Sequence, residues 1–305
     1  MPLRGIDSST KLVCLLGYPV AHSLSPAMHN AAFRHLGLNI CYMSFQVQKE
    51  RLADAMAGIR GLGMVGANVT VPHKVEALGL MDSLSPDAQR IGAVNTIINQ
   101  DGRLIGHNTD GYGLLRALED AGYEPEGEEV VIAGAGGAAR ACALTLAGAG
   151  AARILIVNRT LNKAEDLAEQ VRRAEVQLGT PQQTEKVVNH ATVCKAFPLA
   201  KLKDLMKDAG LLINATSVGL KSAGDCIVDD PGAIRKDMVV CDLVYRRGMP
   251  KGKTRLIEIA EMAGARTVLG LSILLYQGVK AFELWMNQEA PVQVMRRALE
   301  ISVER

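Results

Sequence analysis

The chain has 305 residues, enough for two domains of ordinary size, and its composition, 48% hydrophobic and 22% charged, is typical of a globular protein. A formal net charge of +2 without any basic tract argues against nucleic-acid binding through a charged face, and no apolar run approaches the roughly 18 residues that span a bilayer. The amino terminus lacks the apolar core of a secretory signal, so we expect a cytoplasmic enzyme or binding protein without a membrane partner.

Cysteine and histidine usage gives no sign of a metal site. The six cysteines lie far apart, no Cys-x-x-Cys pair occurs, and the six histidines do not cluster at ligand spacing. We therefore expect buried, reduced thiols and no bound metal.

Strands and helices are expected to alternate along the first part of the chain. The pattern predicts strands over 11–16, 40–47, 66–71 and 92–98, and helices over 25–36, 50–61 and 76–81. Such alternation is typical of an α/β fold with a mostly parallel sheet.

Two hydroxyl groups occupy the loop after the first expected strand. Ser25 precedes Pro26, which predicts a helix with Ser25 as its N-cap and proline at its first position. Ser23 has no such structural explanation, and together the two hydroxyls could bind a carboxylate. An ordinary cap remains the alternative.

The stretch 66–74 carries three groups suited to binding and proton transfer. Asn68 and Thr70 alternate with valines, so both face one side of the expected strand, and Pro72 ends it. Lys74 then follows at the carboxyl end, where open α/β sheets bind ligands. The stretch could hold a small polyhydroxylated molecule and move a proton on it, or it could be an edge strand with a solvated lysine. Asn95 places another amide within the expected strand 92–98.

Asp110 precedes a helical pattern, so helix capping is one interpretation of its carboxylate. The other is a carboxylate aimed into a cleft between two domains. Lys74 and Asp110, if close together, would form a proton-transfer pair in which the carboxylate holds the ammonium.

A dinucleotide site is predicted after the turn-rich link 121–127. An expected strand over 130–133 leads directly into Gly-Ala-Gly-Gly-Ala-Ala-Arg at 134–140, and a helix of small residues runs to about 148. Gly134 permits the tight turn, Gly136 lets the backbone approach a pyrophosphate, and Ala139 stands in the third-glycine position.

The cofactor preference is indicated by the next expected strand, 154–158. An NAD enzyme usually has an acidic residue after this strand to bind the ribose 2′-hydroxyl, and this chain has none. Instead Arg159, Thr160 and Lys163 offer a guanidinium, a hydroxyl and an ammonium, which favours the 2′-phosphate of NADP. The alternative is that Arg159 is simply a surface charge.

Less information comes from the rest of the chain. Residues 175–200 are expected to form a strand and loops, with further strands over 211–214, 239–245 and 268–270. Thr254 is expected to cap a helix ending at Ala263. A long helix over 270–286 has an apolar face, and its polar member Gln277 is either a satisfied core amide or a ligand-binding amide.

Over nearly its whole length the chain resembles the family of shikimate dehydrogenase and quinate/shikimate dehydrogenase. The motifs that carry the resemblance, in the family's order, are GYPVAHSLSPAMHN (17–30), GANVTVPHK (66–74), GAVNT (92–96), NTDGYG (108–113), GAGGAAR (134–140), NRT (158–160), NATSVG (214–219) and YQ…AF…W (276–285).

The resemblance implies NADPH-dependent reduction of 3-dehydroshikimate to shikimate, on the chorismate route to aromatic amino acids. It implies a substrate domain of 1–110 and 271–305, a Rossmann-type NADP domain of 111–270, and a C-terminal helix that returns to the first domain. The partner would be a small-molecule substrate, and the protein a monomer or homodimer.

The resemblance also assigns roles to individual residues. Lys74 and Asp110 would be the catalytic pair. Ser23 and Ser25 would hold the substrate carboxylate, and the other substrate contacts would come from Asn68, Thr70, Asn95, Tyr245 and Gln277. The cofactor contacts would come from Gly134, Ala135, Gly136, Gly137, Ala138, Asn158, Arg159, Thr160 and Lys163, with Leu243 and Gly270 flanking the nicotinamide.

Two other hypotheses stay open. One is a quinate or quinate/shikimate dehydrogenase, although that branch often prefers NAD and carries an acid near Arg159 or Thr160. The other is a non-catalytic relative of the fold, against which the presence of both Lys74 and Asp110 argues.

Overall fold

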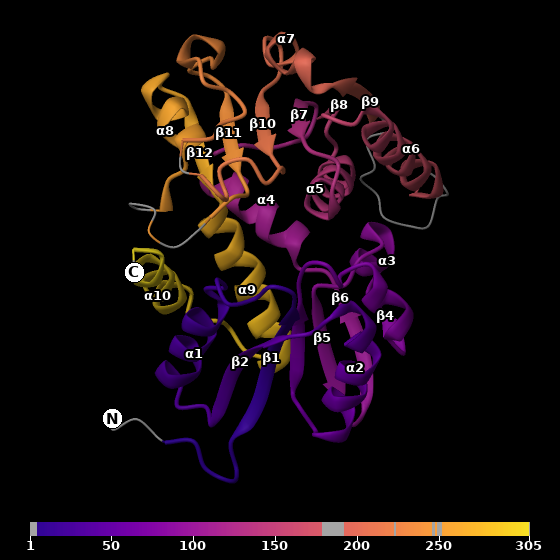
Figure 1. The fold of residues 1–305 in the computed structure, drawn as a ribbon, viewed down its shortest axis with the longest axis vertical. Helices are drawn as coiled ribbons and strands as arrows, with labels where there is room; N and C mark the ends of the chain where they lie inside the picture. The colour runs from indigo at the N-terminus through magenta and orange to yellow at the C-terminus, as the bar shows by residue number, and fades with distance from the viewer. Residues whose placement is uncertain (1–4, 179–191, 223, 246–247, 249–251, 305) are drawn as a thin grey trace. The chain divides into compact units, whose positions relative to one another are not determined.

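The computed structural model describes residues 5–178, 192–222, 224–245, 248 and 252–304. Figure 1 labels its helices and strands. The chain forms two compact units, Met1–Gly113 with Leu274–Arg305, and Leu114–Ile273. The boundaries between them fall inside helices α4 and α9.

The first unit contains a six-stranded sheet of order β2-β1-β3-β5-β6-β4. Its strands are β1 Lys11–Gly17, β2 Ile40–Gln46, β3 Gly66–Val69, β4 Ser83–Leu84, β5 Thr96–Gln100 and β6 Arg103–His107. Only β5 is antiparallel to its neighbours, β3 and β6, so the expected mostly parallel sheet is confirmed. The β5–β6 hairpin turns at Asp101 and Gly102, which both have positive φ (49° and 88°), as tight hairpin turns require.

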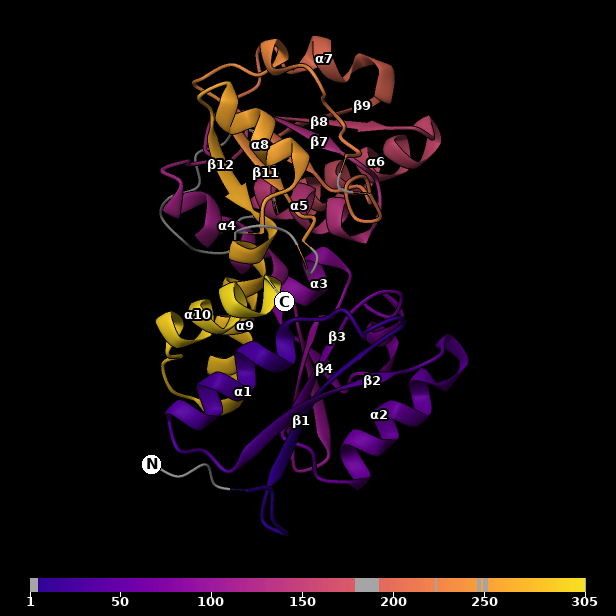
Figure 2. The same ribbon diagram turned by 60° about the vertical axis from the view of Figure 1, so that its left-hand side comes forward.

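Helices cover both faces of this sheet. They are α1 Ser25–His35, α2 Leu52–Gly61, α3 Pro86–Ile91, α10 Val292–Val303 and, from Leu274 on, α9 Gly270–Met286, with short 3₁₀ turns at Lys49–Arg51 and Glu76–Leu80. Helix α4 Asp110–Asp120 begins in this unit and continues into the second. Figure 2 shows α2 on one face and α1, α9 and α10 on the other. Leu52, Met56 and Ile59 of α2 pack on Cys14 and Val69 of the sheet.

The second unit contains a fully parallel sheet of order β12-β11-β10-β7-β8-β9. Its strands are β7 Glu129–Ala133, β8 Arg153–Asn158, β9 Val193–Pro198, β10 Leu211–Asn214, β11 Val239–Asp242 and β12 Arg266–Leu269. Numbered from β7, this is the order 3-2-1-4-5-6 of a Rossmann-type sheet, whose ligand-binding crevice lies where the order reverses, between β7 and β10.

Helices of this second unit are α5 Gly137–Gly148, α6 Leu161–Leu178, α7 Leu202–Leu205 and α8 Arg255–Met262, with 3₁₀ turns at Leu199–Lys201 and Pro231–Ala233. Leu202 of α7 and Ile259 of α8 share one apolar cluster with Val131 and Val240 of the sheet. No residue of α5 or α6 belongs to that cluster, and both helices contact the sheet from the other face.

Several predicted boundaries are wrong by a few residues. Helix α1 begins at Ser25, with Leu24 as its N-cap, so Ser25 is not the cap. Strand β3 ends at Val69, before the Val71–Pro72 cis peptide, and β11 ends at Asp242 rather than 245. Asn95 lies just before β5, which starts one residue later.

Other predictions are confirmed. Thr254 caps α8 by accepting a hydrogen bond from Ile257 N. Helix α9 spans 270–286 as predicted. All six cysteines are free, and four of them are buried as expected, whereas Cys41 and Cys226 are only half-buried. Burial raises the pKa of the Cys14 thiol to about 12. Within the described residues, no helix is long and apolar enough to cross a membrane.

Trp285 of α9 fixes this helix to the first sheet at a glycine. Its indole Nε1 donates to Ile97 O at 2.9 Å, and a Cβ added at Gly66 would lie 2.2 Å from that same oxygen and 2.6 Å from the indole nitrogen. Only glycine therefore permits this contact.

Gly66→Ala should destabilise the protein by about 2 kcal/mol or more, because overpacking a core costs on the order of 1–3 kcal/mol and here also breaks a buried hydrogen bond. Urea unfolding followed by the fluorescence of Trp285, the single tryptophan, measures it. The control is Gly58→Ala in α2, where a Cβ has open space and should stabilise by roughly 0.5–1 kcal/mol. An unfolding midpoint for Gly66→Ala at or above that of the unmodified protein would contradict the packing argument.

Candidate active site

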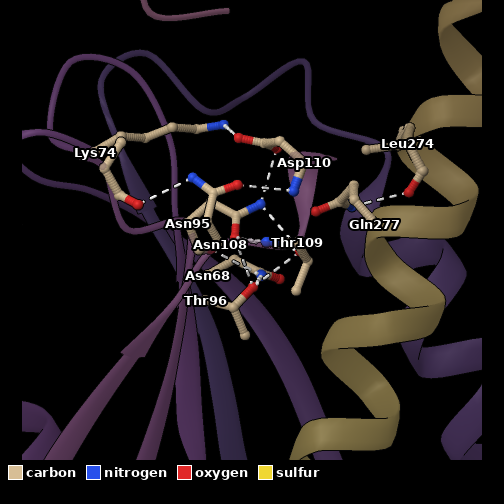
Figure 3. Close-up of polar contacts among 10 residues, drawn as sticks. Asn68, Lys74, Asn95, Thr96, Asn108, Thr109, Asp110, Leu274 and Gln277 are labelled. Carbon is tan, nitrogen blue, oxygen red and sulfur yellow. Dashed lines mark hydrogen bonds and ion pairs between the residues drawn. The ribbon is translucent and has the colours of Figure 1, made fainter. Parts of the chain in front are cut away.

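The structure brings Lys74 and Asp110 together. Lys74 lies five residues beyond the end of β3, and Asp110 is the first residue of α4. Lys74 Nζ donates to Asp110 Oδ2 at 2.6 Å, and the two side chains are 28% and 24% exposed (Figure 3). The pair is thus shielded from bulk water yet reachable by a ligand. Because α4 starts at Asp110 itself, N-capping does not explain its carboxylate.

Two asparagines hold Asp110 in place. Asn95 Nδ2 donates to Asp110 Oδ1 at 2.8 Å, so each carboxylate oxygen has its own donor. The backbone N–H of Asp110 donates to Asn108 Oδ1 at 3.0 Å, and Asn108 is itself held by a bond to Ala93 O. A carboxylate in the first turn of a helix is further stabilised by the helix dipole.

Asn95 is buried and its amide is fully used within the unit. Its second Nδ2 hydrogen goes to Thr109 Oγ1 at 3.0 Å, and its Oδ1 accepts from Thr109 N at 2.8 Å. Its position just before β5 therefore orients Asp110. The predicted contact of Asn95 with a substrate stays a prediction.

Asn68 is buried in the same way. Its Oδ1 accepts from the Tyr42 hydroxyl at 2.7 Å, and its Nδ2 donates to Thr96 Oγ1 at 3.0 Å and to Asn95 O at 3.1 Å. Thr96 Oγ1 in turn donates to Asn95 Oδ1 at 3.0 Å, so a continuous chain of hydrogen bonds runs from Tyr42 to Asp110. Figure 3 shows this chain from Asn68 onward. Sequence reasoning missed Tyr42 and Thr96, because only the strand order brings them beside Asn68.

The other predicted substrate residues of the first unit also carry polar side chains. Ser25 is buried and donates its backbone N–H to Ser23 Oγ at 3.3 Å. Gln277 is half-buried on α9 and points toward Asp110, with its Nε2 donating to Leu274 O (Figure 3). Within the described part of the chain, neither Gln277 Oε1 nor the half-buried Thr70 hydroxyl forms a hydrogen bond.

In the second unit, a glycine turn connects the end of β7 to the start of α5. Gly134 has a φ of 116°, and a Cβ there would lie 2.7 Å from Ala215 O, so only glycine fits. Gly136 is the N-cap of α5 and provides no side-chain cap. Gly136, Gly137 and Ala138 are exposed, and Ala135 is half-buried. The first backbone N–H groups of α5 are thus available to an anion.

Arg140 carries an orphaned polar atom beside this turn. Its Nε is buried without a partner, and no carboxylate pairs with its guanidinium among the residues described. Burial lowers the pKa of Arg140, and a cation in the first turn of a helix is also disfavoured by the helix dipole. A bound pyrophosphate would relieve both costs, so these residues fit a dinucleotide.

Two exposed cations follow the end of β8. Arg159, Thr160 and Lys163 are exposed, and neither Arg159 nor Lys163 forms an ion pair with any described residue. Asn158 shapes the turn by donating to Thr160 O at 2.8 Å. The arrangement suits a phosphate on the ribose.

Leu243 and Gly270 lie against each other at the same edge. A Cβ added at Gly270 would be 2.7 Å from Leu243 O, so glycine is required for this approach. Tyr245, also predicted for the site, follows β11 in the second unit and is half-buried. In the described residues, no group of three His, Cys, Asp or Glu side chains could hold a metal ion.

A parallel sheet of order 3-2-1-4-5-6 with a glycine turn after its first strand defines a protein of the dinucleotide-binding α/β class. Comparison with known proteins narrows this class. Three family models match: the shikimate dehydrogenase substrate binding domain over residues 15–97, shikimate/quinate 5-dehydrogenase over 117–196, and the shikimate 5′-dehydrogenase C-terminal domain over 270–300.

Individual relatives agree with these models. The shikimate dehydrogenase (NADP(+)) of Methanopyrus kandleri is 46% identical over 96% of both chains. A crystal structure of a shikimate dehydrogenase in complex with NADP⁺ has a TM-score of 0.85 and 40% identity, covering 99% of this chain and 98% of that one. The Thermus thermophilus enzyme, in complex with NADP(H) and shikimate, has a TM-score of 0.79 and 36% identity, with 95% and 98% covered. The chain belongs to the shikimate dehydrogenase family.

Tyr42→Phe should destabilise the first unit by about 1–2 kcal/mol, because it leaves the buried Asn68 Oδ1 without its donor while keeping the aromatic ring. Urea unfolding followed by Trp285 fluorescence measures the change. The matched control is Tyr112→Phe, whose ring is 37% exposed and which should stay within about 0.5 kcal/mol. Equal stability of the two variants would show that the hydrogen-bond chain contributes nothing.

Proposed function

We propose that this protein is an NADP-dependent shikimate dehydrogenase, which interconverts 3-dehydroshikimate and shikimate. The observation that carries the proposal is the shielded Lys74–Asp110 pair. Full-length relatives named for this NADP-dependent activity support it. We assign substrate binding to residues 1–110 and 271–305 and cofactor binding to 111–270.

Lys74 and Asp110 are the proton-transfer pair of this proposal. The Lys74 ammonium donates a proton to the ring oxygen that becomes a hydroxyl, and in the reverse direction the lysine takes that proton back. Asp110 keeps Nζ in position, and Asn95 and Asn108 keep Asp110 in position. A positioned general acid typically contributes about 10²- to 10⁴-fold in rate.

NADPH, when bound, supplies the hydride. The turn at 134–138 and Arg140 would hold its pyrophosphate, and Arg159, Thr160 and Lys163 would hold its 2′-phosphate. Leu243 and Gly270, already in contact, would flank the nicotinamide.

Substrate recognition is assigned to groups with spare hydrogen-bonding capacity. The Ser23 and Ser25 hydroxyls would bind the carboxylate, and the Thr70 hydroxyl and Gln277 amide would bind ring hydroxyls. Asn68, Asn95 and Tyr245 are proposed as further substrate contacts. The proposed biosynthetic role would place the protein in the cytoplasm, as a monomer or homodimer.

Lys74→Ala should lower turnover at least 100-fold with little change in substrate affinity, since it removes the proton donor while the predicted carboxylate-binding serines remain. Asp110→Asn should behave similarly. The assay follows absorbance at the nicotinamide band with shikimate and NADP⁺, repeated with quinate and with NAD⁺.

The control for this assay is Lys49→Ala, an exposed lysine of the first unit paired with Glu76, which should retain normal turnover. Normal turnover in Lys74→Ala would refute the assignment of the proton donor. Absence of any activity in the unmodified protein would refute the function, and faster turnover with quinate and NAD⁺ would favour the quinate branch.

Arg159→Gln should weaken NADP⁺ binding roughly 10- to 100-fold, since a hydrogen bond to a charged group is worth about 1.5–3 kcal/mol. Affinity for NAD⁺, which lacks the 2′-phosphate, should be unchanged. Arg153→Gln is the matched control, because Arg153 lies at the other end of β8 and pairs with Glu129. Isothermal titration calorimetry measures the NADP⁺ and NAD⁺ affinities of the unmodified protein and both variants. If Arg159→Gln lost affinity for both cofactors equally, that result would count against a 2′-phosphate contact.

A further inference from the structure

A buried carboxylate stands at the ligand-binding edge of the second unit and has no part in the function proposed above. Asp242 is the last residue of β11 and is 1% exposed. In register it pairs with Asn214 of β10, which pairs with Ala133 of β7, the residue before the glycine turn. Asp242 therefore lies in the row of residues where the sheet meets its ligand.

Among the residues that the structure describes, three donors surround this carboxylate, and none of the three is a cation. Asp242 Oδ1 accepts from Asn214 Nδ2 at 2.9 Å and from Val244 N at 3.0 Å, while Oδ2 accepts from Thr254 Oγ1 at 2.5 Å. Thr254 is also the N-cap of α8. One side chain thus connects the ends of two strands and the start of a helix.

These bonds act on the backbone that carries a predicted nicotinamide contact. Leu243 lies between Asp242 and Val244, and its own N–H donates to Asn214 O at 3.0 Å. With Val244 N held by the carboxylate, the peptide groups on both sides of Leu243 are fixed. The Leu243 carbonyl in turn packs on Gly270, where a Cβ would be 2.7 Å away.

Placing a carboxylate here is costly. Burial raises the pKa of Asp242, while the three donors act in the opposite direction. Buried charges without a counterion are expensive even when hydrogen-bonded, and a neutral side chain could cap the turn at lower cost. The carboxylate differs from an amide in one useful respect: it accepts on both oxygens, so the Thr254 hydroxyl can donate to Oδ2 while Val244 N and Asn214 Nδ2 donate to Oδ1.

We propose that Asp242 is a positioning residue for the nicotinamide end of the cofactor. Its carboxylate fixes Leu243 against Gly270 and so sets the surface on which the nicotinamide rests. The inference rests on the NADP-dependent function proposed above. It assigns to Asp242 no contact with the cofactor itself.

The test is Asp242→Ala, which removes both carboxylate oxygens, so that Val244 N, Asn214 Nδ2 and Thr254 Oγ1 all lose their acceptor. Calorimetry measures binding of NADP⁺ and of adenosine 2′-monophosphate, which carries only the adenosine end. We expect NADP⁺ affinity and kcat each to fall about 10-fold, as loss of a hydrogen bond to a charged group implies, while adenosine 2′-monophosphate binds within twofold of normal.

The matched control is Thr254→Val, which removes the Oδ2 bond and the cap of α8 but leaves the bonds of Val244 and Asn214. It should lower the unfolding midpoint yet keep NADP⁺ affinity within about threefold. If Asp242→Ala does not fold, Asn214→Ala, which removes one Oδ1 donor, decides by the same two affinities.

The outcomes separate the inference from the function on which it rests. Normal NADP⁺ binding and kcat in Asp242→Ala would overturn the inference, and so would an equal loss of adenosine 2′-monophosphate binding, which indicates general damage to the unit. Failure of the unmodified protein to bind NADP⁺ would instead overturn the proposed function. A loss of NADP⁺ affinity without a loss of adenosine 2′-monophosphate affinity would support Asp242 as a positioning residue for the nicotinamide end.

Discussion

The hydrogen bond between the Lys74 ammonium and the Asp110 carboxylate is the interaction on which the account of the site depends. At 2.6 Å it is a charge-assisted bond, of the kind roughly twice as strong as neutral ones. Its geometry is not left to two flexible side chains, because Asn95 and Asn108 fix the carboxylate and Val94 N donates to Lys74 O at 2.8 Å. The polar groups buried beneath the pair therefore serve to keep one contact in one place.

In the second unit, buried polar groups likewise hold the sheet edge at which the ligand binds. Its parallel strands end in register, so Ala133, Asn214, Asp242 and Leu269 form one row across four strands. Glycine stands next to this row wherever backbone must approach backbone, at Gly134 beside Ala215 and at Gly270 beside Leu243. The buried Asp242 carboxylate then joins the segments that follow this row by accepting hydrogen bonds from Asn214, Val244 and Thr254. In both units, buried polar side chains hold the functional edge of the sheet in a fixed shape.

Local patterns in the sequence predicted much of this fold. The glycine turn, the long helix α9 and the Lys74–Asp110 pair follow from turn chemistry, helical periodicity and motif spacing. The interiors of the two networks could not be predicted in the same way. Tyr42 of β2 and Asn68 of β3 form a hydrogen bond across the intervening strand β1, so their contact depends on the strand order. Asp242 forms a hydrogen bond with Thr254, twelve residues later in the chain. Such partners depend on strand order and loop path, which no local pattern encodes.

The most direct test of the central claim is a crystal structure with shikimate and NADP⁺ both bound. The account predicts that Lys74 Nζ keeps its hydrogen bond to Asp110 and also lies within hydrogen-bond distance of a substrate ring oxygen next to the nicotinamide. An Nζ that turns to solvent, or that leaves Asp110 when the ligands bind, would contradict it.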